Sequence, residues 1–242
     1  MDISVKTDIG KIREMNQDYV KEHKFDDETA LLIVCDGMGG AAAGNVASEV
    51  AANSIYDTFL KRYNTSFNDR DLETLMTSAV NGANLDVFDL AENNKEYYGM
   101  GTTVVAVFIS EGYAYTIHAG DSRAYIIYPD SISRITTDHS IVQQLIESHM
   151  ITEEEAKTHP KRNVITRALG VAECLETDFN ITKLEKDFTL LSCSDGLTNY
   201  VSENDIFEIC NKYDAPRICE ELINLANKNG GGDNISVAVA KE

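Results

Sequence analysis

The sequence contains little that would divide it into separate parts. Only 3 of its 242 residues are proline, and no serine- or glycine-rich stretch lies between two halves. A chain of this length suits one large domain or two small ones. Because a linker is missing, we expect a single domain over residues 1–242. The hydrophobic fraction of 43% is enough for a sizeable core.

Cysteine is scarce and shows no pairing. The number of cysteines is odd and none of their spacings is C-x-x-C, so the sequence suggests neither a disulfide framework nor a zinc site. This usage fits a reducing cytoplasm. The five cysteines are Cys35, Cys174, Cys193, Cys210 and Cys219.

Basic residues are also few. The chain has 21 Lys and Arg against 40 Asp and Glu, which gives a formal net charge of −19. Such a surface repels nucleic acid and anionic lipid, so neither is expected as a partner. No apolar run approaches the roughly 18 residues that a membrane span needs, and the first residues show no signal-peptide pattern. We therefore expect a soluble, cytoplasmic protein and, by default, a monomer.

The hydrophobic pattern places pairs of helices between groups of strands. Apolar residues at three- and four-residue spacing predict helices over 44–63, 71–92, 203–212 and 216–228. Short apolar or alternating runs predict strands over 3–8, 18–25, 30–35, 102–109, 112–118, 123–128, 188–193 and 235–240. The run over 30–35 (ALLIVC) is continuously apolar, which predicts a strand buried on both faces. The strands over 102–109, 112–118 and 123–128 are expected to form an antiparallel meander. Residues 138–170 are expected to form a polar excursion from the core. Without βαβ alternation, this order indicates an α+β fold.

Four aspartates lie at the ends of predicted strands. Asp36 and Asp195 each follow an apolar strand and precede a glycine. Asp233 leads into the last strand, and Asp121 lies in a turn between two strands. Any one of them alone is more typical of an ordinary turn. Carboxylates that converge from adjacent strands repel one another unless a divalent cation is bound.

Ligands that are all oxygen favour Mg²⁺ or Mn²⁺ over Zn²⁺, and the carbonyl of Gly37 can join them. Two such ions would activate a bridging water and clamp a phosphoryl group. Arg13 is the candidate anchor for the phosphate, since a guanidinium matches phosphate oxygens. Other phosphate chemistries lack their motifs: no cysteine has arginine six positions later, and Gly10-Lys11 does not fit G-x-x-x-x-G-K-[ST].

Seven short segments, in order along nearly the whole chain, carry a resemblance to a known family. They are R-E-M-N-Q-D at 13–18, V-C-D-G-M-G-G at 34–40, G-T-T at 101–103, G-D-S-R at 120–123, T-R-A-L-G at 166–170, S-D-G-L at 194–197 and G-G-D-N-I-S at 231–236. Each segment is weak alone, but all seven in this order are specific. The chain resembles the metal-dependent protein phosphatases of the PPM type, also called protein phosphatase 2C. Its D-G-M-G-G form and compact length resemble the bacterial branch.

The resemblance implies a fold and a set of ligands for two Mn²⁺ or Mg²⁺ ions. The fold would be a four-layer α-β-β-α sandwich of two mainly antiparallel sheets flanked by helix pairs. Residues 138–170 would form a flap beside the active site. Asp36 would bridge the two ions, with the Gly37 carbonyl on one of them. Asp195 and Asp233 would complete the other.

The same resemblance gives roles to further residues. Asp18 would act at or just behind this site, and Asn234 would support the ligands from behind. Asp121, together with Asp195, would hold a more loosely bound third ion. Arg13 would bind the phosphate of the substrate.

The implied reaction is hydrolysis of phosphoserine and phosphothreonine on proteins. A metal-bridging hydroxide would attack phosphorus in line, and no phosphoenzyme would form. Members of the bacterial branch often oppose membrane-anchored serine/threonine kinases, so a cognate kinase is the expected partner. One position departs from the family's pattern. Some eukaryotic members carry histidine, a proposed general acid, where this chain has Met38, which leaves His139 and His159 as candidate proton donors.

Three other functions fit parts of the pattern. A catalytically inactive relative that binds phosphoproteins would be free to lose the acidic set, which is intact here. A plain acidic cation-binding protein would need neither Arg13 nor the G-T-T and G-D-S-R turns. A related phosphatase dedicated to one partner in a stress or sporulation cascade is usually fused to a sensor or membrane segment.

Overall fold

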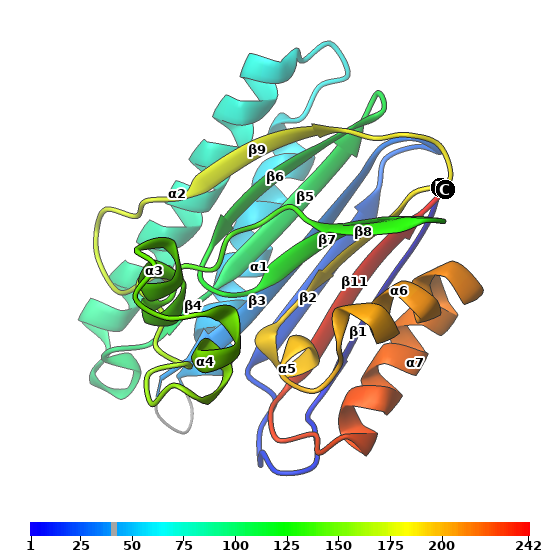
Figure 1. The fold of residues 1–242 in the computed structure, drawn as a ribbon. Helices are drawn as coiled ribbons and strands as arrows, with labels where there is room; N and C mark the ends of the chain where they lie inside the picture. Colours follow the sequence, from blue (N-terminus) through cyan, green and yellow to red (C-terminus); the bar gives the residue numbers. More distant parts are fainter. Residues whose placement is uncertain (40–42) are drawn as a thin grey trace.

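The computed structural model of the chain describes residues 1–39 and 43–242. Gly40, the last residue of the D-G-M-G-G segment, lies outside the described residues. Two antiparallel sheets pack face to face, and helices cover the outer face of each sheet (Figure 1). The α+β fold class and the four-layer α-β-β-α sandwich are therefore confirmed.

The two sheets bring distant parts of the chain together. The first sheet has the order β1 (Asp2–Asp8), β11 (Ile235–Lys241), β10 (Thr189–Cys193), β7 (Arg123–Tyr128) and β8 (Ser131–Arg134). The second has the order β2 (Asp18–Lys24), β3 (Ala30–Met38), β5 (Val104–Ser110), β6 (Tyr113–Ala119) and β9 (Asp178–Lys183). The short β4 (Gly101–Thr102) pairs with the end of β3. The first and last strands of the chain thus lie side by side.

Strand β3 explains how one apolar run serves two layers. Its side chains alternate, as they do in any strand. Leu31, Ile33 and Cys35 join the cluster beneath the helices. Leu32 and Val34 join the cluster between the two sheets. The prediction of a strand buried on both faces is confirmed.

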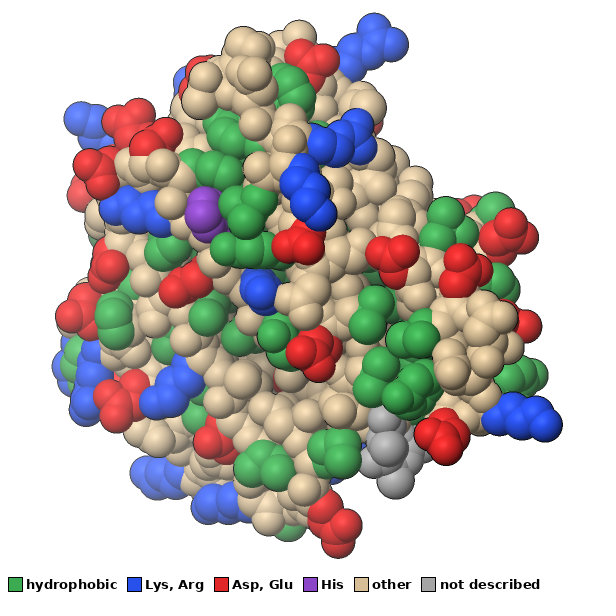
Figure 2. Space-filling model, turned by 180° about the vertical axis from the view of Figure 1, so that it is seen from behind, with side chains coloured by type: hydrophobic (Ala, Val, Ile, Leu, Met, Phe, Trp, Pro, Cys, Tyr) green, Lys and Arg blue, Asp and Glu red, His purple; other side chains and the backbone are tan. Residues whose placement is uncertain are grey.

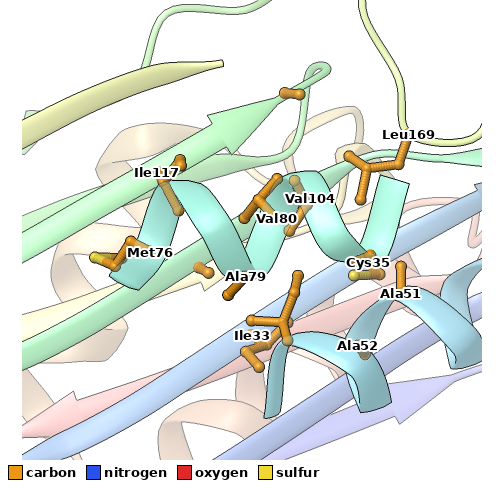
Figure 3. Close-up of a cluster of buried hydrophobic side chains, with 14 of the residues drawn as sticks. Ile33, Cys35, Ala51, Ala52, Met76, Ala79, Val80, Val104, Ile117 and Leu169 are labelled. Atoms are coloured by element: carbon orange, nitrogen blue, oxygen red, sulfur yellow. The ribbon is translucent and has the colours of Figure 1, made fainter. Parts of the chain in front are cut away.

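One helix pair covers the second sheet. It consists of α1 (Gly44–Arg62) and α2 (Asp69–Asn93). Small residues such as Ala51 and Ala79 let these helices approach the sheet residues Ile33 and Val104 closely (Figure 3). The N-cap of α2 is Asn68, whose side chain accepts hydrogen bonds from the next backbone amides, in the way typical of helix starts.

A second helix pair covers the first sheet. It consists of α6 (Glu203–Lys212) and α7 (Ala215–Lys228). The side chain of Asp214 caps α7, and proline in the first turn costs no hydrogen bond there. The apolar faces of both helices pack with Tyr125, Leu191 and Val237 of the sheet.

The predicted meander is wrong in its last step. Strands β5 and β6 do pair antiparallel in the second sheet. Strand β7 instead lies in the first sheet, between β10 and β8. The turn before β7 is therefore a crossing between the two sheets, and it carries Asp121. Strands β8 and β9 and the short helix α5 (Asp195–Thr198) were not predicted, because they are short and partly exposed.

The excursion over 138–170 contains two short helices. They are α3 (Ile141–Glu147) and α4 (Glu153–Thr158). Its two ends meet, because Ser140 and Ile165 form an isolated β-bridge and the Thr166 amide donates to the His139 carbonyl over 2.7 Å.

Charged side chains are spread over the surface. On the face shown in Figure 2, acidic side chains lie among basic and hydrophobic ones and do not gather in one patch. Such exposed carboxylates favour solubility. Within the described part of the chain, no helix combines the length and the apolar character that crossing a membrane requires.

The layer between the sheets should dominate stability. Leu32 is fully buried there, so we expect Leu32→Ala to lower the free energy of unfolding by about 2 to 5 kcal/mol. In thermal unfolding this corresponds to a fall in Tm of about 5 to 15 °C. Leu85→Ala on α2 is the matched control, because Leu85 is 43% exposed. Equal, small effects of both substitutions would contradict this account of the core.

Candidate metal centre

The acidic residues from the sequence motifs meet at one end of the sandwich. Asp18 begins β2 and lies opposite Asp36 of β3 in the antiparallel register. Asp195 begins α5, directly after β10, and the start of β2, the end of β3 and α5 all lie at the lower end of Figure 1. Burial raises the pKa of Asp36 well above its usual range. The negative charges of Asp18, Asp195, Asp121 and Asp233 raise it further.

Asp18 is a buried carboxylate with one free oxygen. Its Oδ2 accepts a hydrogen bond from the Ser194 hydroxyl over 2.7 Å. Its Oδ1 has no hydrogen-bond partner among the described residues. Burial raises the pKa of Asp18 to about 7, although the hydrogen bond from Ser194 opposes the shift. A buried polar atom without a partner is rare and calls for a ligand.

Asp36 is fixed through its backbone by the G-T-T segment. The Asp36 amide donates to the Thr103 hydroxyl oxygen over 3.0 Å, and the Thr103 amide donates to the Asp36 carbonyl over 2.8 Å. The Thr102 hydroxyl donates to the same carbonyl over 2.9 Å. The Thr103 hydroxyl also lies 2.7 Å from the Ser122 hydroxyl. Thr103 thus connects Asp36 with the turn that carries Asp121.

Gly37 lies where no side chain fits. A Cβ at this position would lie 2.0 Å from the carbonyl oxygen of Gly44, at the start of α1. The Gly37 amide donates to the Gln17 carbonyl over 3.0 Å. The backbone of α1 and that of the loop before β2 therefore pack directly on the end of β3, next to Asp36.

Asn234 supports the loop that carries Arg13. Its Oδ1 accepts a hydrogen bond from the Gln17 amide over 2.8 Å. Its Nδ2 donates to the carbonyls of Ile9 and Met15 over 2.9 and 3.0 Å. Asn234 is buried, and its side chain is engaged in holding the backbone on both sides of Arg13.

Arg13 lies at the rim of the carboxylate cluster. Its Nη2 lies 2.8 Å from Oδ2 of Asp233, and its side chain is 51% exposed. The hydrogen bond to Asp233 raises the pKa of Arg13, and the charges of Asp36 and Asp195 add to this effect. The guanidinium therefore faces the cluster and remains open to solvent, where an anion can reach it.

Asp195 and Asp121 complete the cluster. The Asn199 side chain, one helical turn later, donates to Oδ2 of Asp195 over 3.0 Å. Burial raises the pKa of Asp195, as does the charge of Asp233. Burial and the charge of Asp195 raise the pKa of Asp121 to about 7. The charge of Asp195 therefore acts on the carboxyl group of Asp121.

The donor set fits hard divalent cations. The five carboxylates are all aspartates, of which Asp18 is buried and the others are half-buried. Like charges side by side in such a site are strongly unfavourable without a counter-charge. Mg²⁺ and Mn²⁺ prefer such oxygen ligands, whereas Zn²⁺ favours cysteine and histidine. The free oxygen of Asp18 and the mutual effects on pKa are the observations that fit bound cations. The members are Asp18, Asp36, Asp121, Asp195 and Asp233.

Several supporting residues were not recognised from the sequence as part of the site. Ser194 and Asn199 bind carboxylates of the cluster directly, and both lie within five residues of Asp195 in the S-D-G-L region. Their position next to Asp195 in the sequence was the signal that could have identified them. Thr103 belongs to a segment that carried the resemblance, but its link between Asp36 and the turn at Ser122 depends on tertiary structure.

A second cluster lies beside the turn of Asp121. The rings of His118 and His139 stack with centroids 4.6 Å apart, and Asp178 and Arg167 lie next to His139. Burial lowers the pKa of His139, and the neighbouring His118 and Arg167 lower it further. Nδ1 of His139 accepts a hydrogen bond from the Gly120 amide, and Nε2 lies 3.4 Å from Oδ2 of Asp178. This arrangement does not favour His139 as the proton donor for the leaving group, the role that Met38 cannot fill. His159 uses its Nδ1 to accept from the Lys161 amide.

Comparison with known proteins places this chain in a family. The family model described as Protein phosphatase 2C matches residues 11–236. The serine/threonine phosphatase stp of Listeria innocua is 36% identical over 242 residues, which cover 100% of this chain and 96% of the relative. The protein phosphatase PhpP of Streptococcus pneumoniae is 36% identical over 241 residues, which cover 99% of this chain and 96% of the relative.

Solved structures agree with these matches. The serine/threonine phosphatase Stp1 from Staphylococcus aureus superposes with a TM-score of 0.93 at 34% identity, over 100% of this chain and 94% of that chain. The catalytic domain of the serine threonine protein phosphatase PstP, solved in complex with 2 manganese ions, superposes with a TM-score of 0.86 at 31% identity, over 99% of this chain and 97% of that chain. The chain therefore belongs to the protein phosphatase 2C family, the PPM-type protein phosphatases, in its bacterial branch.

Proposed function

We propose that this chain hydrolyses phosphoserine and phosphothreonine on proteins and needs divalent metal ions to do so. The observation that carries the proposal is the convergence of five aspartates, one buried and four half-buried, with Arg13 at their rim. The relatives named as serine/threonine phosphatases align with this chain almost from end to end, which supports the same activity here. The alternative is an inactive phosphoprotein-binding regulator of the same fold. Measurement of turnover would exclude it.

The aspartates would hold an inner pair of ions and one outer ion. Asp36 would bridge two Mn²⁺ or Mg²⁺ ions, with the Gly37 carbonyl on one ion and Asp195 and Asp233 on the other. The free Oδ1 of Asp18 would face the same ions, directly or through water. When bound, such an ion pair supplies an activated water at neutral pH and neutralises phosphate charge.

An outer ion would lie between Asp121 and Asp195. Its aspartate ligands are fewer than those of the inner pair, so it would be held more loosely. The raised pKa of Asp121, to about 7, also means that protons compete with the ion for this carboxylate at neutral pH.

The protein's own groups bind and orient the substrate. Arg13 would donate two parallel hydrogen bonds to non-bridging phosphate oxygens, because a guanidinium matches that geometry. Its present partner Asp233 keeps it at the site. Met38 offers no proton for the leaving oxygen, and the ring nitrogens of His139 face the Gly120 amide and the Asp178 carboxylate. We infer that water supplies that proton.

The remaining assignments concern the whole protein. We infer one catalytic domain over residues 1–242, with residues 138–170 as a flap that influences substrate access. Phosphorylated proteins would be the substrates and a serine/threonine kinase the opposing enzyme in bacterial signalling. We further infer that the protein is a cytoplasmic monomer. We expect no nucleic-acid or membrane partner, because the formal net charge of −19 repels nucleic acid and anionic lipid.

The activity should depend on metal and on the inner aspartates together. We expect the purified protein to hydrolyse a phosphothreonine peptide with Mn²⁺ and to lose this turnover in EDTA. Asp36→Asn and Asp195→Asn should each lower kcat by at least about 100-fold, since catalysis by such ions is mainly electrostatic. Asp57→Asn, at an exposed position of α1, is the matched control. A folded, Mn²⁺-bound wild type without turnover would favour the inactive regulator.

Arg13 should affect both substrate binding and rate. A charge-assisted hydrogen bond contributes about 1.5 to 3 kcal/mol, so we expect Arg13→Ala to lower kcat/KM for a phosphothreonine peptide by roughly 10- to 100-fold. Arg62→Ala, at an exposed position of α1, should leave it unchanged. Initial rates over a range of peptide concentrations measure the effect. Unchanged kinetics of Arg13→Ala would remove Arg13 from the phosphate site.

The metal-free protein should be less stable at high pH. The folded pKa values of Asp18 and Asp121 are raised to about 7, whereas an unfolded aspartate has a value of about 4. Between these limits the folded state binds more protons than the unfolded state, so the free energy of unfolding falls as pH rises. In EDTA we expect Tm to be at least about 5 °C lower at pH 8 than at pH 5.5.

Saturating Mn²⁺ should remove this pH dependence, because the ions replace the protons as counter-charge. Scanning calorimetry at both pH values, with EDTA and with Mn²⁺, separates the two effects. A metal-free protein that is more stable at pH 8 than at pH 5.5 would contradict the repulsion that we infer among the aspartates.

A further inference from the structure

His139 holds the backbone next to Asp121 at two points. The His139 amide donates to the Gly120 carbonyl over 2.8 Å. The Gly120 amide donates in turn to Nδ1 of the His139 ring over 3.1 Å. One residue therefore satisfies both backbone polar groups of Gly120. Gly120 has φ of +110°, a conformation that favours glycine, and a Cβ there would lie 2.6 Å from Thr103 Cγ2.

The hydrogen bond from Gly120 fixes the tautomer of His139. Because Nδ1 accepts, the neutral ring must carry its proton on Nε2. This nitrogen lies 3.4 Å from Oδ2 of Asp178, which can accept that proton. Arg167 Nη1 lies 2.9 Å from the same nitrogen, but both are donors in this tautomer, so Nη1 donates instead to Oδ1 of Asp178 over 2.7 Å. A carboxylate behind a histidine orients the ring in the same way at many catalytic sites.

Packing restrains the ring as well. The ring of His118 stacks on that of His139 with an angle of 7° between their planes. His118 is fixed in turn, because its Nε2 lies 2.7 Å from the Thr137 carbonyl and must donate to it. Both histidines are at most 7% exposed. The orientation of His139 is therefore set from several sides.

This second cluster has the residue types of a metal site, but the ring nitrogens of His139 are not free to bind a metal. Ligand atoms of His118, His139 and Asp178 all lie within 4.8 Å of one another. However, Nε2 of His139 carries a proton, and the Arg167 guanidinium lies 2.9 Å from the same nitrogen. A cation could bind only after this guanidinium had left. The arrangement is a hydrogen-bond network that ends on the Gly120 backbone.

The position of His139 in the chain joins this network to the excursion over 138–170. The His139 carbonyl accepts from the Thr166 amide over 2.7 Å, where the excursion returns. The neighbouring Asp138 pairs with Arg123, which follows the Asp121 turn, over 2.6 Å. The start of the excursion is thereby fastened to both sides of Asp121.

We propose that His139 is a positioning residue that holds the Gly120–Asp121 turn so that the Asp121 carboxylate can bind the outer, weakest divalent ion. The inference rests on the proposed function, because it assumes an ion between Asp121 and Asp195. His139 touches neither the ion nor the substrate. It acts through the Gly120 peptide, and Asp178 keeps its ring in the tautomer that accepts from that peptide.

The test compares two substitutions that differ in one acceptor. In His139→Asn the side-chain oxygen can take the place of Nδ1, whereas His139→Phe keeps a ring for stacking on His118 but has no acceptor. Mn²⁺ binding is followed by titration with electron paramagnetic resonance of the free ion, without any substrate. In His139→Phe we expect the weakest dissociation constant to rise by about 10- to 100-fold, the usual effect of removing a residue that supports a ligand.

The other readouts distinguish positioning from general damage. The two tighter Mn²⁺ sites should be unchanged in His139→Phe, and His139→Asn should restore the weakest site to within about 3-fold of wild type, since it keeps the supporting contact. His23→Phe, which removes a partly buried histidine hydrogen-bonded to Tyr56, should leave all sites unchanged. If His139→Phe does not fold, Asp178→Ala replaces it, because it frees the tautomer and should weaken the same site.

Asp121→Asn separates this inference from the function on which it rests. This variant should lose the weakest Mn²⁺. If it binds all ions as wild type does, the outer ion is not at Asp121 and the proposal falls with that assignment, while metal-dependent turnover by the inner pair is unaffected. If Asp121→Asn loses the ion but His139→Phe, or Asp178→Ala in its place, keeps wild-type affinity at every site, the role of His139 alone is overturned.

Discussion

Five aspartates, one buried and four half-buried, lie together at one end of a β-sandwich, and their mutual repulsion is the constraint on which the rest of the site depends. In Asp36 this repulsion adds to burial and raises the pKa of the carboxyl group well above its usual range. Such a cluster opposes folding unless protons or cations compensate it. The sandwich tolerates it because the large apolar layers lie elsewhere, between the sheets and beneath the helices. The fold thus supplies the stability that the acidic end lacks.

The architecture turns short polar contacts into rigid positions for these carboxylates. Thr103 interrupts the run between β4 and β5 and uses its amide and hydroxyl to fix the backbone of Asp36. Ser194 does the same for the side chain of Asp18 from the neighbouring sheet. Each contact joins segments that are far apart in sequence. Preorganised groups of this kind let bound ions act without reorganisation during a reaction.

Much of this arrangement could be predicted from the sequence. The run ALLIVC before Asp36 predicted a strand buried on both faces, and β3 has that alternation. The aspartates of the motifs were expected to converge, and the structure brings Asp18, Asp36, Asp121, Asp195 and Asp233 into one cluster. These features are local or are marked by motif residues, so a single sequence carries them.

Other features depend on tertiary contacts that a sequence pattern does not show. The turn at Asp121 looks like a hairpin, yet it crosses between the sheets, because β7 pairs with β10. The strand β9 has the mixed sequence DFNITK and gains its place only by pairing with β6. His118 and His139 are 21 positions apart and appeared unrelated, but stacking and Asp178 make them one network. Nothing in their spacing predicted a role beside Asp121.

The central claim is that the five aspartates hold divalent ions, and anomalous scattering from crystals grown with Mn²⁺ tests it most directly. Our account predicts two strong peaks at the manganese edge that share Asp36, and a weaker third peak between Asp121 and Asp195. Peaks that avoid the aspartates, or a single peak among His118, His139 and Asp178, would contradict it.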